Sequence, residues 1–217
     1  LQKLNEFGAL EYIHPALEEM KYVGADEEGK YHKEGSVWNH TLMVVEEMQK
    51  IRGNDEIALM MALTHDIGKV KSRNTHDVVG IDIAEEFIKD SLKLSNTYIR
   101  NCKNGVRYHM RIHNTPLDSR NSMNEKKVID MVDKVINNID LYIDLAKADA
   151  RGRIPYQEAN EDSIRKRLEL AKEAIDIVDA GYSMQKRDGS IDDYDGEAIG
   201  QMITQDRVEY MKERQKI

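Results

Sequence analysis

The sequence has little cysteine, little proline and few aromatic residues, and each shortage excludes a kind of structure. Its single cysteine, Cys102, cannot form a disulfide within the chain, which agrees with a reducing, cytoplasmic location. Only three prolines occur in 217 residues, among which Leu, Ile, Met, Glu and Lys recur. This composition argues against a β-sheet protein and favours an all-α fold.

Long apolar runs and an excess of positive charge are also missing. No run approaches the ~20 apolar residues that a membrane span needs, and no basic segment followed by an apolar one marks a secretion signal. The formal net charge is -8, with 33% charged and 6% aromatic residues. These values predict a cytoplasmic acidic globular protein without a membrane partner, and they argue against a broad cationic surface for nucleic acid.

Apolar residues recur at spacings of three and four along most of the chain, which predicts an all-helical bundle. We expect helices at residues 37–51, 55–67, 76–90, 96–113, 125–150, 161–180 and 197–214. The length suits one principal domain with a small appendage. We place this domain, with an N-terminal lead-in, at residues 1–155 and a C-terminal helical extension, packed on the core, at residues 156–217.

A carboxylate lies on an apolar face near the end of the fifth predicted helix. Asp149 continues a face that steps by four and three residues through Val128, Val132, Val135, Ile139, Tyr142 and Ala146. A carboxylate on a buried face is costly unless it is paired, hydrogen-bonded or bound to a metal. Asp149 therefore caps a neighbouring helix, pairs with an arginine or binds a cation.

Histidines interrupt the apolar faces of three other predicted helices. His109 and His113 continue the face of the fourth, His40 lies on that of the first, and His65 lies on that of the second, directly before Asp66. A single inward histidine is more often a hydrogen-bonded core residue, and the His65-Asp66 pair alone would suit a frayed helix end. Inward histidines and acids from four helices together favour a shared cation.

These ligand types narrow the expected cofactor to a divalent metal ion. Mixed imidazole and carboxylate ligands suit Mn, Fe, Co, Ni or Zn, whereas an all-oxygen set would suit Mg or Ca better. The sequence does not distinguish among Mn, Co, Ni, Mg, Fe and Zn as the bound ion. Such an ion lowers the pKa of a bound water and polarises a phosphoryl oxygen. No covalent machinery competes, because Cys102 lies on an apolar face as a packing residue and the sequence has no phosphate-binding Gly-rich loop or dinucleotide fingerprint.

Several stretches carry a family resemblance. His40, His65-Asp66 in "THDIGK" and Asp149 in "KADARGR" resemble the H…HD…D signature of the HD superfamily of metal-dependent phosphohydrolases. The stretches "HKEGSVWNHTLMVVEEM" and "ADARGR" are similar to the HD domain that follows the nucleotidyltransferase part of bacterial CCA-adding enzymes. The tail "GEAIGQMITQDRVEYM" is similar to the region after that domain. The resemblance covers residues 28–155 and, more loosely, the tail.

The resemblance implies that one divalent cation is ligated by four side chains, namely His40, His65, Asp66 and Asp149. His76 and His109 match positions that in some HD proteins hold a second metal or contact phosphate, and His113 is a further candidate. In the alternative, His76 caps or flanks the third helix, and His109 and His113 hydrogen-bond each other. His32 and Glu34, before the first helix, are expected at the rim of the pocket.

Basic residues near these positions have two interpretations each. Lys69 and Arg73 resemble residues that face substrate phosphate in the family, although solvated surface charges would give the same pattern. Arg151 and Arg153 either reach the phosphate or hold the metal-bearing carboxylate in an ion pair. A separate basic stripe on the fourth predicted helix is expected to be an exposed face, and it consists of Arg100, Lys103, Arg107 and Arg111.

The resemblance implies a stand-alone phosphohydrolase, either a phosphodiesterase or a phosphatase, in which a metal-activated water attacks a phosphorus ester. Asp66 would orient or deprotonate that water, and Lys69 with nearby arginines would offset the developing charge. The substrates implied are 2',3'-cyclic phosphates, other nucleotides or RNA ends. The continuation "HDIGKV" lacks the acidic "HDxxED" of alarmone hydrolases, and the stretch before residue 30 is too short for a polymerase head, so we expect no CCA addition by this chain itself.

A second function class is a catalytically weak or inactive nucleotide- or RNA-binding HD module that acts with a partner in tRNA metabolism. The complete H…HD…D set argues against a pure scaffold, and the net charge of -8 argues against a large RNA footprint. The tail serves dimerisation as readily as substrate selection.

Overall fold

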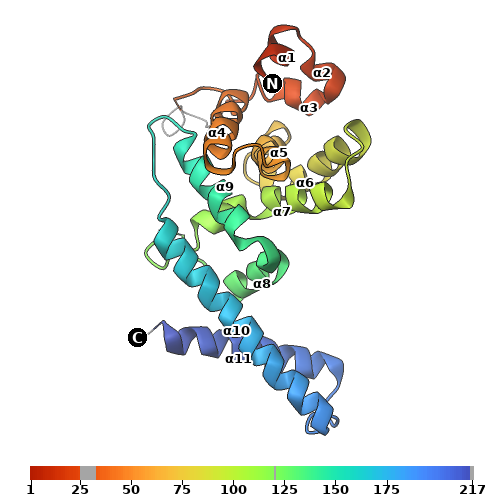
Figure 1. The fold of residues 1–217 in the computed structure, drawn as a ribbon, viewed down its shortest axis with the longest axis vertical. Helices are drawn as coiled ribbons and strands as arrows, with labels where there is room; N and C mark the ends of the chain where they lie inside the picture. The colour runs from red at the N-terminus through yellow and green to blue at the C-terminus, as the bar shows by residue number, and fades with distance from the viewer. Residues whose placement is uncertain (25–32, 120, 216–217) are drawn as a thin grey trace. The chain divides into compact units, whose positions relative to one another are not determined.

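The computed structural model of the protein describes residues 1–24, 33–119 and 121–215, and Figure 1 shows their helices. Helices make up the regular structure of this described part, in which no β-strand forms and an isolated bridge joins Gly24 to Ser36. The predicted all-α fold is confirmed. None of the described helices combines the length and the apolar character that crossing a membrane requires.

The chain divides into two compact units, each built from segments that are far apart in sequence. The first unit holds Leu1–His113 and Asp140–Ala159, and the second holds Asn114–Ile139 and Asn160–Ile217. The chain passes between the units at residues 113 and 114, 139 and 140, and 159 and 160. The domain boundary that we expect at residue 155 stays a prediction. The segment Asn114–Ile139, however, belongs with the C-terminal helices.

The first unit contains most of the helices. It opens with three short helices that the sequence pattern did not predict, α1 (Gln2–Glu6), α2 (Leu10–Ile13) and α3 (Pro15–Glu19). Its main helices are α4 (Val37–Arg52), α5 (Glu56–Thr64), α6 (His76–Glu86), α7 (Asn96–His113) and α9 (Ile139–Arg151). A 3-10 helix, η1 (Ile67–Val70), follows α5, and a π-helical turn, η2 (Phe87–Ser91), follows α6.

Side-chain caps fix the starts of α4 and α5. Ser36 Oγ accepts a hydrogen bond from the N–H of Asn39 at 3.2 Å. Asp55 Oδ1 accepts from the N–H groups of Ile57 and Ala58, each at 3.1 Å. The apolar faces of both helices are then buried, through Val37, Trp38, Val44 and Met48 of α4 and through Ala58, Met61, Ala62 and Leu63 of α5.

Two glycines allow η1 to lie directly against α6. A Cβ added at Gly68 would collide with the carbonyl oxygen of His76, and one added at Gly80 would lie 2.8 Å from Val106 Cγ1 and 3.0 Å from the Cα of Gly68. Because no side chain fits between the two backbones, this contact depends on glycine at both positions. It brings the segment that follows Asp66 beside the start of α6.

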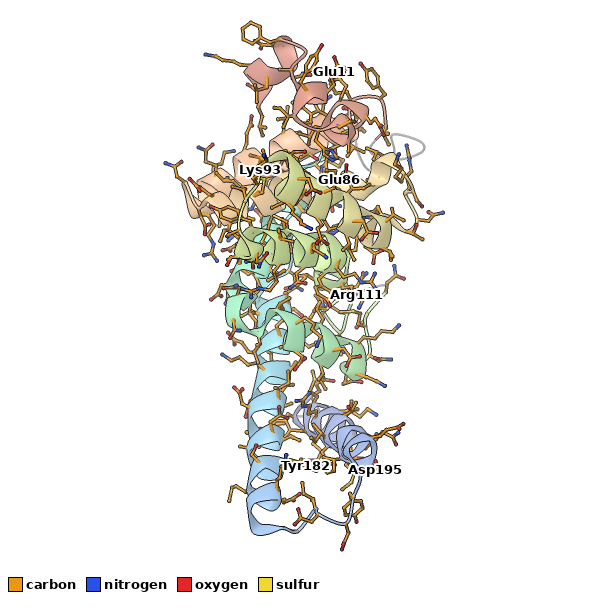
Figure 2. The ribbon with its side chains drawn as sticks, turned by 90° about the vertical axis from the view of Figure 1, so that its right-hand side faces the viewer. Glu11, Glu86, Lys93, Arg111, Tyr182 and Asp195 are labelled. Atoms are coloured by element: carbon orange, nitrogen blue, oxygen red, sulfur yellow. The ribbon has the colours of Figure 1, made fainter. Side chains whose placement is uncertain are left out.

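The second unit is built around a pair of long helices. Its helices are α8 (Glu125–Val135), the 3-10 turn η3 (Ile136–Asn138), α10 (Glu161–Asp188) and α11 (Gly196–Arg214). Figure 1 shows α11 lying across α10. Tyr182 on α10, labelled in Figure 2, donates a hydrogen bond to Asp206 Oδ2 of α11 at 2.8 Å. Arg207 of α11 pairs with Asp179 of α10 through Nη2 and Oδ1 at 2.6 Å.

A buried arginine joins α10 to the loop before α8. Arg167 is only 4% exposed and donates hydrogen bonds to the carbonyl oxygens of Thr115 and Met123, each at 2.5 Å. It also donates to Ser122 Oγ at 3.0 Å. These bonds satisfy backbone acceptors of the loop that would otherwise be buried without partners.

The prediction of a single helix over residues 125–150 is wrong. The segment divides into α8, η3 and α9, and its two ends belong to different units. Asn137 and Asn138 lie at the break. Asn is unfavourable inside a helix because its side chain forms local hydrogen bonds that compete with those of the helix backbone. The apolar face expected to run on to Asp149 is therefore not continuous. The sixth predicted helix is longer than expected, since α10 continues to Asp188 and ends at Gly189, whose φ is 78°.

Candidate metal centre

The four side chains implied as ligands of one cation come from separate places in the first unit. His40 lies in the first turns of α4, His65 and Asp66 lie where α5 passes into η1, and Asp149 lies near the end of α9. Their exposed fractions, in the same order, are 1%, 0%, 2% and 3%. Because the junction of α5 and η1 is buried on both sides, the adjacent histidine and carboxylate lie inside the core and not at a frayed helix end.

Three of these residues form what we call the first cluster, namely His40, His65 and Asp149. His40 Nε2 lies 3.1 Å from Asp149 Oδ1 and 3.4 Å from His65 Nε2. One atom of each residue that is able to bind a metal lies within 4.8 Å of the others. Ligand bonds of ~2.0–2.2 Å to a shared ion place neighbouring ligand atoms ~3–3.5 Å apart, so the spacing suits one cation.

Asp66, His76 and His109 form the second cluster. His76 Nε2 lies 3.1 Å from His109 Nε2, and these two atoms lie 3.5 Å and 3.4 Å from Asp66 Oδ1. The other oxygen of Asp66, Oδ2, faces the first cluster, 3.7 Å from His40 Nε2 and 3.4 Å from His65 Nε2. One carboxylate thus stands between two pairs of histidines. The buried Oδ1 accepts no hydrogen bond of normal geometry from the described part of the chain.

Backbone carbonyls orient all four histidine rings in the same way. The Nδ1 atoms of His40, His65, His76 and His109 lie 3.0, 2.8, 2.5 and 2.8 Å from the carbonyl oxygens of Gly152, Ala62, Arg73 and Val106. A carbonyl oxygen only accepts, so each Nδ1 carries the hydrogen and a neutral ring keeps its lone pair on Nε2. Lone pairs that face each other repel unless a proton or a metal cation lies between them, and this is the ring orientation of metal-bound histidine.

Lys69 brings a positive charge beside Asp66. Its Nζ lies 2.6 Å from Asp66 Oδ2, and its side chain keeps 13% exposure, so the ammonium group lies between the clusters and solvent. Burial alone would raise the pKa of Asp66, but the positive charge of Lys69 and the neighbouring His65 and His109 rings hold that pKa well below its usual range. Asp66 is therefore ionised, as metal ligation requires.

Arg153 and His113 hold the other buried carboxylate. Arg153 Nη2 lies 3.0 Å from Asp149 Oδ1, and His113 Nε2 lies 2.8 Å from Asp149 Oδ2. Burial would raise the pKa of this carboxyl, but these two groups and His40 hold it well below its usual range. Burial would also lower the pKa of His40, yet hydrogen bonds to Asp149 and Glu34 raise it to about 9. The site thus favours a cation at His40 Nε2, either a proton or a metal.

The remaining basic candidates lie in different surroundings. Arg151 pairs with Glu158 through Nε and Oε2 at 2.9 Å, so Arg153 alone of the two takes the predicted ion pair with Asp149 among the described contacts. Arg73 has a buried Nη1 without a hydrogen-bond partner in the described residues. Both positions remain predicted phosphate contacts.

Two cations of the basic stripe of α7 pair with acids of α6. Lys103 forms an ion pair with Glu85, and Arg107 Nη1 lies 2.6 Å from Asp77 Oδ2. Arg111, labelled in Figure 2, lies with its guanidinium 5.5 Å from a neighbouring tyrosine ring centroid. The predicted exposed face is thus an interhelical ion-pair surface in part, which weakens its attraction for phosphate.

Sequence reasoning placed two further residues at the rim of the pocket. His32 lies outside the described residues. Glu34 is not at a rim, because its side chain is only 1% exposed and its Oε1 lies 3.1 Å from His40 Nδ1. The carbonyl acceptors behind the histidines were also missed, since a backbone oxygen leaves no signal in a sequence.

The sequence is similar to a known protein family and to two curated proteins. Residues 37–138 match the family model described as "HD domain". A "Multifunctional CCA protein" from Thioalkalivibrio sulfidiphilus (strain HL-EbGR7) is 26% identical over 231 residues, covering 97% of this chain and 50% of that protein. A second protein of this name, from Alkalilimnicola ehrlichii (strain ATCC BAA-1101 / DSM 17681 / MLHE-1), is 24% identical over 218 residues, covering 94% and 49%. The chain spans about half the length of these curated relatives.

Proposed function

We propose that this chain, whose residues 37–138 match the family model described as "HD domain", is a metal-dependent phosphohydrolase that acts on nucleotides, 2',3'-cyclic phosphates or RNA ends. The observation that carries the proposal is the convergence of four histidine Nε2 atoms on the two oxygens of Asp66. Each oxygen faces one histidine pair, so each side of this carboxylate would help its histidine pair to hold a divalent cation.

The donor set of the two clusters fits divalent metals. The first cluster together with Asp66 would hold one ion, and the second cluster would hold another that shares the same carboxylate. Buried Nε2 lone pairs and ionised carboxylates match the mixed N and O ligation of Mn, Fe, Co, Ni or Zn. When bound, these ions supply Lewis acidity toward a phosphoryl oxygen and lower the pKa of water.

The chain's own residues would bind and orient the substrate. Lys69, Arg153 and His113 contact the two metal-bearing carboxylates and keep side-chain exposures of 13%, 19% and 22%, so a phosphate that enters from solvent meets their positive or hydrogen-bonding ends. We assign them, with Arg73, to phosphate binding. Asp66 orients the attacking water, and Lys69 offsets charge that develops on the phosphate.

The substrate class follows from the resemblance and from the charge. The similarity to CCA-adding enzymes favours RNA ends and 2',3'-cyclic phosphates among the possible esters. The net charge of -8 favours small phosphorylated groups over an extended polyanion, since a long RNA would need many cationic contacts.

The test is hydrolysis by chelated protein that is resupplied with Mn, Co, Ni, Mg or Zn. Bis-p-nitrophenyl phosphate, p-nitrophenyl phosphate and 2',3'-cAMP separate diester from monoester chemistry. We expect metal-restored turnover that Asp66→Ala abolishes without loss of the helical circular dichroism signal. Asp82→Ala, which removes an exposed carboxylate of α6, is the matched control and should keep full turnover.

Two outcomes would contradict the proposal. Unchanged turnover in Asp66→Ala would move the reaction away from these clusters. Metal binding without turnover of any ester would instead favour the second function class, an HD module that binds nucleotide or RNA.

A further inference from the structure

Behind the first cluster lies a buried carboxylate that the metal site itself does not use. The Glu34 side chain is 1% exposed, and its Oε1 lies 3.1 Å from His40 Nδ1, on the side of the ring opposite the cluster. The same Nδ1 lies 3.0 Å from the carbonyl oxygen of Gly152. His40 Nδ1–H is therefore shared between two acceptors, of which one is charged.

Two hydrogen bonds, one from a side-chain amide and one from a backbone N–H, hold Glu34 in this position. The amide Nδ2 of Asn39, in the first turn of α4, donates to the Glu34 carbonyl oxygen at 2.9 Å. The backbone N–H of Ile154, just after α9, donates to Glu34 Oε2 at 3.0 Å. Glu34 thus connects the helix that carries His40 with the chain that follows Asp149, and both carboxylate oxygens have a donor.

A carboxylate behind a histidine changes how that histidine binds metal. Its negative charge fixes the proton on Nδ1, makes Nε2 a stronger donor toward the metal and holds the ring against rotation. Such outer partners typically contribute ~10–100-fold to metal affinity. The other three histidines have a backbone carbonyl at Nδ1, so His40 has a charged partner in addition to the one that they share.

We propose that Glu34 is a positioning residue, which fixes the ring of His40 through Nδ1 and tightens metal binding at the first cluster but not at the second. The proposal rests on the proposed function, because it assigns a role at the same site.

The first test measures metal affinity at each cluster separately by Co²⁺ absorption titration against a competing chelator. Glu34→Gln is made in a His76→Ala background, which leaves the first cluster, and in a His65→Ala background, which leaves the second. We expect ~10–100-fold weaker binding in the first background and no change in the second. Glu46→Gln, the same substitution at an exposed position of α4, should change neither.

The second test needs no metal. In the proton NMR spectrum the His40 Nδ1–H should resonate at low field because it donates to a carboxylate, and Glu34→Gln should move it upfield. Glu34→Asp, which keeps the charge on a shorter side chain, should restore part of the metal affinity. It also serves as the variant for both tests if Glu34→Gln does not fold.

The outcomes separate this proposal from the function. Unchanged Co²⁺ affinity in folded Glu34→Gln, or an equal loss at both clusters, would overturn the role of Glu34 alone. Wild-type protein that binds Co²⁺ with the expected Glu34 dependence but hydrolyses no ester would contradict only the proposed phosphohydrolase. Wild-type protein that binds no metal would contradict both.

Discussion

The ability of each buried histidine to bind metal depends on the hydrogen-bond acceptor at its Nδ1 atom. A histidine on a buried helix face is ordinarily a packing residue, but four rings whose Nδ1 atoms are held by carbonyl oxygens must turn Nε2 the other way. Asp66 lies where those nitrogens meet, with Lys69 and the rings keeping it ionised. The orientation of the rings, more than their number, makes the two clusters suitable for metal.

Replacement of Asp149 by Asn should release the first metal. The change removes the charge that His40, His113 and Arg153 contact, so we expect affinity to fall by more than the ~10–100-fold typical of losing an outer partner. Elemental analysis after dialysis measures the retained metal. The control is Asp144→Asn, which lies on the same helix as Asp149 and breaks a half-buried ion pair with Arg52 of α4. Full metal occupancy in Asp149→Asn would remove this residue from the ligand set.

Part of the site was predictable at this scale and part was not. Helical periodicity found His65 and Asp149 because a polar residue on an apolar face is visible in the sequence. It did not separate Arg151 from Arg153, since the two lie within two residues of each other at the end of α9 and only the backbone path decides that Arg153 meets Asp149. Glu34 was misplaced because burial of a loop residue depends on the helices that cover it.

Among the elements, the contact of η1 with α6 positions both clusters. It joins the segment after Asp66 to the helix that begins at His76, and it exists because two glycine backbones touch. Sequence periodicity predicts that the helices form but does not predict this contact, because glycine adds no apolar signal. Periodicity fails in the same way at residues 125–150. The apolar spacing there continues through η3, so it does not indicate that the helix breaks or that the chain passes from one unit to the other.

Gly80→Ala should destabilise the first unit. The new methyl group would lie 2.8 Å from Val106 Cγ1 and 3.0 Å from the Gly68 Cα, and overpacking of this kind costs ~1–3 kcal/mol. Denaturant unfolding followed by the fluorescence of Trp38, the one tryptophan of the sequence, reports on this unit. Gly181→Ala in α10, where the added atom meets nothing within 4 Å, should instead leave the protein unchanged or stabilise it by up to ~1 kcal/mol. Equal stability of wild type and Gly80→Ala would contradict the close contact.

For the whole molecule, net charge sets what kind of substrate is attracted. The chain carries -8, and two cations of the α7 stripe are paired with acids of α6. Among the residues that the structure describes, Lys69 and Arg153 bring positive charge directly beside the carboxylates of the clusters. This distribution suits one terminal phosphate and does not suit a long backbone.

Salt dependence should show this small footprint. For an RNA oligonucleotide that ends in a 2',3'-cyclic phosphate, the logarithm of kcat/KM should fall with the logarithm of salt concentration with a slope of about -0.7 to -1.4, as for one or two phosphates. The mononucleotide 2',3'-cAMP should give a similar slope. A slope steeper than about -4 for the oligonucleotide alone would indicate an extended RNA-binding surface.

The central claim, that the two histidine pairs and their carboxylates hold metal, is tested most directly by anomalous diffraction from crystals soaked in Mn²⁺ and measured across the Mn absorption edge. We predict one peak among His40, His65, Asp66 and Asp149 and a second among Asp66, His76 and His109, each at ligand distance from the Nε2 atoms. Ordered, well-diffracting crystals without a peak at either position would contradict the account.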